Sequence, residues 1–250
     1  MSAGFADHFS GVAAGYASHR PDYPAALFSW LAAQCPRRER AWDCATGSGQ
    51  AARGLAAHFA AVIATDASAQ QIAQARPVPG VEFRVAPAEA SGLDAASVDL
   101  VSVAQALHWF AGDAFYAEAR RVLRPGGVLA AWGYGRLCFS QPRLEAVLRP
   151  FYEQALAPHW PAERRHVEAQ YRNLPFPAPE IPAPGFAIQR RWDLARTLGY
   201  IGTWSAVSRA QSAGAAALWR DFEADLRRAW GDAAREQAVN WPLFLRAARY

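Results

Sequence analysis

Short apolar runs alternate with alanine-rich, more polar segments along the first half of the chain. Such runs are typical of strands buried on both faces, and the segments between them are long enough to be helices. Strands that alternate with helices form βαβ units, in which helices cover both faces of a parallel sheet. The predicted strands cover 41–44, 61–65, 81–85, 98–104 and 127–132, and the helices between them cover 49–59, 68–76 and 112–123.

The second half of the chain is less regular. Residues 140–185 are rich in proline and are expected to form an insertion that acts as a lid. Residues 186–194 and 238–249 are expected to be strands on either side of a helix at 212–230. An antiparallel hairpin of these two strands would complete the sheet.

The N-terminal segment is expected to contribute helices at 5–18 and 24–35, separated by a stretch with two prolines. Together these patterns predict an α/β fold with a doubly wound, mostly parallel seven-stranded sheet in one domain. The domain spans 1–250 and divides into a helical cover (1–36), a core (37–135), the insertion (140–185) and the closing strands and helix (186–250).

Composition excludes several protein classes. With 250 residues, 52% hydrophobic and 19% charged, the chain can bury its own core and is not disordered. Its three cysteines form no CxxC pair, which excludes a disulfide framework and a zinc ribbon and favours a reducing compartment. No apolar run approaches the ~20 residues of a membrane span, and no leader is visible, so we expect a cytoplasmic protein without a membrane partner.

The formal net charge is +4, and every basic residue other than histidine is an arginine. Because these arginines are scattered, we expect no nucleic-acid partner. Histidines show no HxxxH spacing, so we expect no metal site. We expect a monomer or a homodimer.

The strongest local motif follows the first predicted strand, which ends in Asp43. A turn of small residues comes next, Ala45, Thr46, Gly47, Ser48 and Gly49, and a helix begins near position 50. Small residues allow a sharp turn and let a ligand approach the backbone at the start of the helix.

A second acidic residue, Asp66, ends the second strand, 17 positions after Gly49. A carboxylate at this point can reach the two hydroxyls of a ribose. A dinucleotide site would have a GxGxxG spacing, which is missing, and Asp43 would repel a pyrophosphate. Asp43 would attract a cationic amino acid group, which favours S-adenosylmethionine as the cofactor.

On these residues the chain resembles the class I S-adenosylmethionine-dependent methyltransferases, and among them the group that includes trans-aconitate methyltransferase. The matching segments occur in the family's order and cover about half of the chain. They are YASHRPDYP (16–24), WDCATGSGQAA (42–52), ATDAS (64–68), VAPAEA (85–90), VDLVSVAQALHWF (98–110), RRVLRPGGVLAAW (120–132) and GYIGTWSAV (199–207).

The resemblance implies roles for individual residues. Asp43 and the backbone of the small-residue turn would hold the methionine part of the cofactor, Asp66 would bind the ribose, and Ala67 would lie against the adenine. The remaining implied cofactor residues are Ala88 and Glu89 at the adenine edge, Gln105 and Ala106 beneath the sulfonium, and Tyr16, Arg20 and Tyr23 in the N-terminal cover.

Two positions depart from the family pattern. Ala45 stands where the first glycine is usual, and alanine is tolerated there if its φ is negative. Pro87 stands where many members have an Asp that binds the adenine amino group, so Glu89 or a backbone carbonyl would take that role.

Methyl transfer is a direct displacement, in which the protein supplies alignment and electrostatics. A carboxylate acceptor needs no base, whereas a hydroxyl acceptor needs one. His108, just past the fourth strand, is the candidate for a general base or for a hydrogen bond to the acceptor; otherwise its ring shapes the wall of the site. The candidate acceptor-binding residues are Phe9, Trp109, Trp132, Tyr134 and Trp204.

The predicted function is the transfer of a methyl group to a small molecule, first of all to an oxygen of a small organic acid. Alternatives are a methyltransferase acting on RNA or protein, a nucleotide-dependent oxidoreductase, and a cofactor-binding protein without catalysis.

Overall fold

The structure is a computed structural model that describes residues 21–177 and 179–250. Within them the chain forms one eight-stranded sheet in the order β3-β2-β1-β4-β5-β8-β6, with β7 paired to β8. The strands are β1 (Arg40–Cys44), β2 (Ala61–Asp66), β3 (Val81–Val85), β4 (Val98–Ala104), β5 (Leu123–Tyr134), β6 (Cys138–Phe139), β7 (Phe186–Trp192) and β8 (Gln237–Arg249).

The first five strands are parallel, as predicted. Strands β1 and β4 are buried along nearly their whole length, which explains their continuous apolar sequence. The predicted α/β fold with a mostly parallel sheet is therefore confirmed. The sheet has one strand more than the seven expected, because the two-residue β6 pairs with β8.

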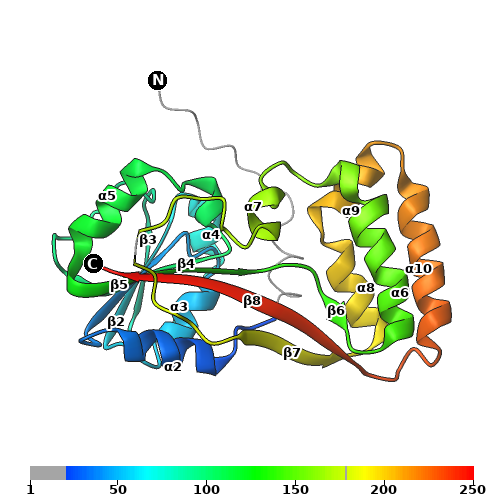
Figure 1. Ribbon diagram of the computed structural model, residues 1–250, viewed down its shortest axis with the longest axis horizontal. Coiled ribbons are helices and arrows are strands. Elements are labelled where there is room, and N and C mark those ends of the chain that lie inside the picture. The colour runs from blue at the N-terminus through cyan, green and yellow to red at the C-terminus, as the bar shows by residue number, and fades with distance from the viewer. Residues whose placement is uncertain (1–20, 178) are drawn as a thin grey trace.

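Helices cover both faces of the parallel strands (Figure 1). On one face, α2 and α3 pack through buried leucines, and on the other α5 packs through Phe115, Ala119 and Val122. The helices are α2 (Ala25–Gln34), α3 (Gln50–Leu55), α4 (Ala69–Ala73), α5 (Asp113–Val122), α6 (Pro142–Pro150), α7 (Arg164–Glu168), α8 (Leu194–Gly202), α9 (Ser205–Ser212) and α10 (Ala216–Trp230).

The antiparallel end of the sheet carries the chain into a helical lobe. β8 runs antiparallel to β5 along its second half and to β7 along its first half. Its first half extends toward α6, α8, α9 and α10, which gather at the right-hand end of Figure 1. The rings of Phe151 and Phe222 stack at 3.9 Å in this lobe.

The sequence predicted one helix at 212–230 in this region, and the structure has three. Asp193 ends the strand expected at 186–194 early, because its side chain accepts the Arg196 N–H at 2.8 Å and caps α8. Gly214, with a φ of +81°, separates α9 from α10.

The proline-rich insertion is partly helical. α6 lies at the start of the insertion and buries Leu144 and Leu148 in the helical lobe. The last part of the insertion, after α7, is mostly irregular. The expected helix at 24–35 is present as α2, and the one expected at 5–18 lies outside the described residues.

Candidate functional site

Asp43 lies at the carboxyl end of β1 and is completely buried. Its carboxylate accepts hydrogen bonds from the hydroxyls of Thr46, at 2.5 Å, and Ser102, at 2.7 Å. Ser102 is the β4 residue directly opposite Asp43 in the parallel register. Burial raises the pKa of Asp43 to about 6, although both hydroxyl hydrogen bonds lower it. The site therefore holds a buried carboxylate whose ionised form a nearby cation would stabilise.

The turn after β1 is tight and partly left-handed. Gly47 and Gly49 have φ values of +58° and +84°, and Ala45 has a φ of +54°. The negative φ that would suit alanine at position 45 is therefore not found. The turn needs a left-handed residue here, and alanine adopts that conformation at a cost of about 1–2 kcal/mol.

Asp66 connects this turn to the end of β2. Its Oδ2 accepts the Gly47 N–H at 2.9 Å, and its Oδ1 accepts the Ser68 N–H at 2.8 Å. Because β1 and β2 are parallel neighbours, the carboxylates of Asp43 and Asp66 lie at the same edge of the sheet. The charge of Asp66 contributes to the raised pKa of Asp43.

An apolar surface continues beyond Asp66. Val85 pairs with Asp66 in the register of β3 and β2, and its side chain is 56% exposed. Ala67 is also exposed and Ala88 is half-buried. Glu89 is exposed on the same loop. Val85 is not among the predicted site residues, although it is the last residue of a predicted strand, which is a signal for this edge.

Gln105 joins the ends of β4 and β5. Its backbone N–H donates to Trp132 O at 2.8 Å, and its side-chain amide donates to Tyr134 O at 3.0 Å. Its φ of +57° places it in the left-handed region. A Cβ at Gly133 would come within 2.9 Å of the Gln105 Oε1 and 2.5 Å of the Phe244 ring, so β8 also contributes to this edge. Ala106, the next residue, is buried.

His108 lies in a short 3-10 turn, η1 (Leu107–Trp109), directly after this edge. Its Nδ1 is 3.0 Å from the hydroxyl of Tyr171, a residue 63 positions away. Burial, with a smaller effect of the Arg164 charge, lowers the pKa of His108 to about 4. The ring is therefore neutral at pH 7. The neighbouring ring of Trp109 is 37% exposed.

Comparison with known proteins shows the family of this chain. Residues 42–131 match the model of a methyltransferase domain. A Dictyostelium discoideum protein named as a methyltransferase is 30% identical to the chain over 248 residues, which is 96% of this chain and 94% of the relative. The chain belongs to the class I S-adenosylmethionine-dependent methyltransferases.

Solved structures of other methyltransferases have the same fold as this chain. A protein from Anaeromyxobacter dehalogenans, described as a type II methyltransferase, has a TM-score of 0.87 and 49% identity, covering 92% of this chain and 97% of that one. A methyltransferase structure from Anabaena variabilis has a TM-score of 0.53 at 18% identity, covering 90% and 98%, which shows the fold alone. The finer resemblance to the trans-aconitate group stays a prediction.

The predicted aromatic acceptor residues that the structure describes lie in three places in this methyltransferase. Trp109 lies beside His108, with ring centroids 4.8 Å apart. Tyr23 covers the buried rings of Trp132 and Tyr134, with ring centroids 5.7 and 6.2 Å away. Trp204 lies in the helical lobe, where its ring packs against Tyr152. The structure thus does not bring Trp204 into contact with Trp132 or Tyr134. Phe9, Tyr16 and Arg20 lie outside the described residues.

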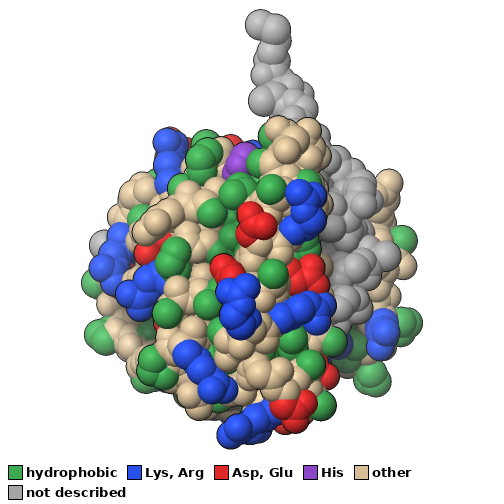
Figure 2. Space-filling view, turned by 90° about the vertical axis from the view of Figure 1, so that its right-hand side faces the viewer, with side chains coloured by type: hydrophobic (Ala, Val, Ile, Leu, Met, Phe, Trp, Pro, Cys, Tyr) green, Lys and Arg blue, Asp and Glu red, His purple; other side chains and the backbone are tan. Residues whose placement is uncertain are grey.

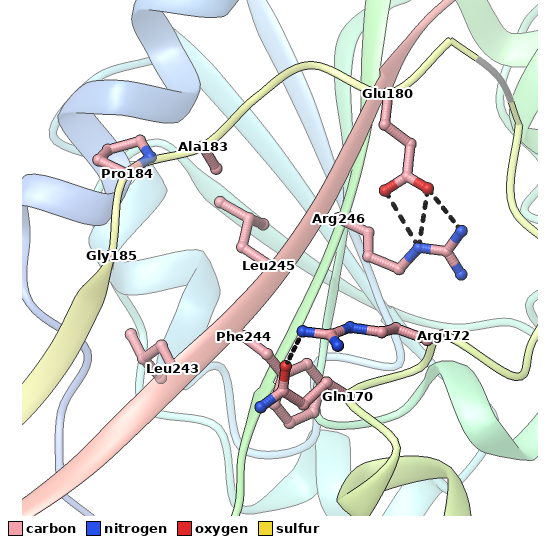
Figure 3. Close-up of a pocket in the computed structure, with 10 residues that line it drawn as sticks. All are labelled: Gln170, Arg172, Glu180, Ala183, Pro184, Gly185, Leu243, Phe244, Leu245 and Arg246. Atoms are coloured by element: carbon pink, nitrogen blue, oxygen red, sulfur yellow. Dashed lines mark hydrogen bonds and ion pairs between the residues drawn. The ribbon is translucent and has the colours of Figure 1, made fainter.

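A cavity of about 530 Å³ lies at the outer edge of β8 (Figure 3). None of the predicted site residues that the structure describes lines it. In Figure 3, Arg246 pairs with Glu180 above the cavity, and Arg172 donates to Gln170 across Phe244. Phe244 links this cavity to the edge formed by Gly133 and Gln105. Its lining residues are Gln170, Arg172, Glu180, Ala183, Pro184, Gly185, Leu243, Phe244, Leu245 and Arg246.

The described part of the methyltransferase contains neither a metal-binding cluster nor a helix suited to a membrane. No group of three or more His, Cys, Asp or Glu side chains there could hold a metal ion. None of the described helices combines the length and the apolar composition that crossing a membrane requires.

Proposed function

We propose that the chain binds S-adenosylmethionine at the carboxyl edge of β1, β2 and β4 and transfers its methyl group to an oxygen of a small organic acid. One observation supports this most. Two carboxylates, Asp43 and Asp66, flank an open backbone turn at the ends of adjacent parallel strands. Among the described residues, the nearest atom to a Cβ at Gly47 would be the Gln71 Oε1 at 3.7 Å, which leaves room for a ligand to approach the backbone there.

The residues at this edge fit a cationic ligand. The Asp43 carboxylate is buried beside neutral hydroxyls, so an ammonium group would relieve part of the cost of its charge. A pyrophosphate would instead bring further negative charge toward two carboxylates. Asp66, whose two oxygens accept the backbone N–H groups of Gly47 and Ser68, is a carboxylate at the end of the second strand, the position from which an acid can reach a ribose diol. The exposed Val85 and Ala67 offer an apolar surface for an adenine ring.

The bound cofactor supplies a methyl group activated by the adjacent sulfonium. The chain's own residues align the acceptor and exclude water. Burial lowers the pKa of His108 to about 4, which makes its imidazole a weak proton acceptor. A carboxylate acceptor is already deprotonated at this pH and needs no base. This match supports a carboxylic acid rather than an alcohol.

Charge distribution supports a small molecule rather than a nucleic acid. On the face made by the helical lobe, basic and acidic side chains are interspersed (Figure 2). On α10, Arg227 pairs with Glu223 and Arg228 with Asp225. Paired charges of both signs give no continuous basic surface for a phosphate backbone.

Titration calorimetry tests the cofactor. We expect one-to-one micromolar binding of S-adenosylhomocysteine and no binding of NADH. Tight NADH binding would overturn the proposal. The acceptor is tested with radiolabelled S-adenosylmethionine and a panel that begins with trans-aconitate and fumarate, with their alcohol analogues as controls. Label transfer to the alcohols alone would contradict a carboxylate acceptor.

A further inference from the structure

Tyr171 is the partner of His108 and is completely buried. It follows α7 in the insertion, and its ring lies perpendicular to that of Phe244 at 4.9 Å. Its φ of +61° is unusual for an aromatic residue. A conformation of this kind persists only where the surroundings fix it, which suggests that the position of the hydroxyl matters.

Arg246 of β8 holds the backbone around Tyr171. One guanidinium nitrogen, Nη1, donates to the carbonyls of Tyr171, at 2.7 Å, and Leu174, at 2.9 Å. The other nitrogens pair with Glu180, as Figure 3 shows. The guanidinium also lies 4.5 Å from the ring centre of Phe176. Arg246 thus ties residues 171–177 and Glu180 to β8, beside the bridge between Glu180 and Ala248.

The hydrogen bond between Tyr171 and His108 determines which imidazole nitrogen of His108 is protonated. Burial raises the pKa of Tyr171, so its phenol keeps its proton at neutral pH. Among the described residues, the Nδ1 of His108 is the acceptor that lies within hydrogen-bond distance of this buried hydroxyl. The phenol proton is then directed to the Nδ1 of His108, 3.0 Å away. Because a neutral imidazole carries one proton, that proton is on Nε2.

We propose that Tyr171 is a positioning residue that fixes His108 with its proton on Nε2, so that His108 donates a hydrogen bond to the acceptor's carboxylate instead of removing a proton. This inference rests on the proposed function. The step balances without a base: a carboxylate oxygen forms a bond to the methyl carbon, the carbon–sulfur bond breaks, and its electron pair returns to sulfur. The products are a methyl ester and a neutral thioether, and no proton is released.

The proton position is measured by ¹⁵N NMR of the imidazole rings, and the signal of His108 is assigned from its loss in His108→Gln. We expect the wild-type protein to show Nε2 protonated and Nδ1 as acceptor between pH 6 and 8. Tyr171→Phe keeps the ring that packs on Phe244 and should give a mixture of both proton positions. A proton on Nδ1 in the wild type, or no change in Tyr171→Phe, would overturn the inference.

The role as a donor is tested with two substitutions of His108. Glutamine places an N–H near the position of Nε2 but cannot act as a base. Leucine can neither donate a hydrogen bond nor act as a base. With trans-aconitate or fumarate as acceptor, His108→Gln should stay within about fivefold of wild-type kcat/KM, and His108→Leu should lose about 30-fold or more, mainly through KM. Equal losses in both variants would contradict a donor.

S-adenosylhomocysteine binding, measured by calorimetry, should be unchanged in all three variants. If the wild type methylates neither acid, the proposed acceptor is wrong, and a donor role toward a carboxylate is wrong with it. The NMR result still decides separately whether Tyr171 positions His108.

Discussion

Ser102 of β4 donates a hydrogen bond of 2.7 Å to the Asp43 carboxylate at the end of β1. The two residues are direct partners in the parallel register, so the central pair of strands fixes the orientation of this carboxylate. Thr46 supports it from the turn. The buried acid is thus positioned by the fold before any ligand binds.

We expect the ionised Asp43 carboxylate to lower the stability of the folded protein and to strengthen cofactor binding. Its pKa is raised from 3.8 to about 6 in the folded protein. Between about pH 4 and pH 6 the native state therefore binds more protons than the unfolded chain. Stability attributable to this group therefore falls as pH rises from about 4 to 6. Asp43→Asn should raise the free energy of unfolding at pH 7.5 by about 1–3 kcal/mol and have less effect near pH 4.

The same variant should weaken S-adenosylhomocysteine binding by about 10- to 100-fold, since a charged hydrogen bond is lost. Urea unfolding at the two pH values and calorimetry measure the two effects. Ser102→Ala is the matched control: it keeps the carboxylate and should weaken binding less. Unchanged binding in Asp43→Asn would mean that the cofactor lies elsewhere.

Ala45→Gly should stabilise the protein. Alanine at a φ of +54° carries a steric cost that glycine avoids, partly offset by the greater freedom of glycine in the unfolded chain. We expect a net gain of about 0.5–1 kcal/mol in urea unfolding. Ala52→Gly, in the buried face of α3, is the opposite control and should lose about 1 kcal/mol. A loss in both variants would contradict the strain at Ala45.

Local sequence was sufficient to predict the carboxyl edge. Asp43, the small-residue turn and Asp66 follow strands whose apolar runs are unmistakable, and parallel strands bring their ends together. What sequence could not predict depends on distant contacts. Tyr171 meets His108 across 63 positions, because Arg246 fixes the backbone of an insertion with little regular structure. The positive φ of Ala45 is likewise imposed by the turn, since alanine by itself favours a negative φ.

Gly133→Ala should disturb the packing around Gln105 at the ends of β4 and β5. The added Cβ would lie 2.5 Å from the Phe244 ring and 2.9 Å from Gln105 Oε1, so one of them must move. We expect a loss of about 1–3 kcal/mol in unfolding free energy, together with weaker S-adenosylhomocysteine binding. Gly135→Ala is the control, because no atom of the described residues lies within 4 Å of a Cβ there. If Phe244→Leu, added to Gly133→Ala, restores no stability, the clash with Phe244 is not the cause.

Arg246→Gln should loosen residues 171–177 from β8. The substitution removes two hydrogen bonds to backbone carbonyls, the ion pair with Glu180 and the contact with Phe176. The expected cost is about 1–3 kcal/mol, with faster protease cleavage within the segment. Arg249→Gln, which loses a single exposed hydrogen bond to Gly126 O, should change little. Limited proteolysis followed by mass spectrometry locates the cleavage. Equal cleavage of both variants and the wild type would show that Arg246 does not hold this segment.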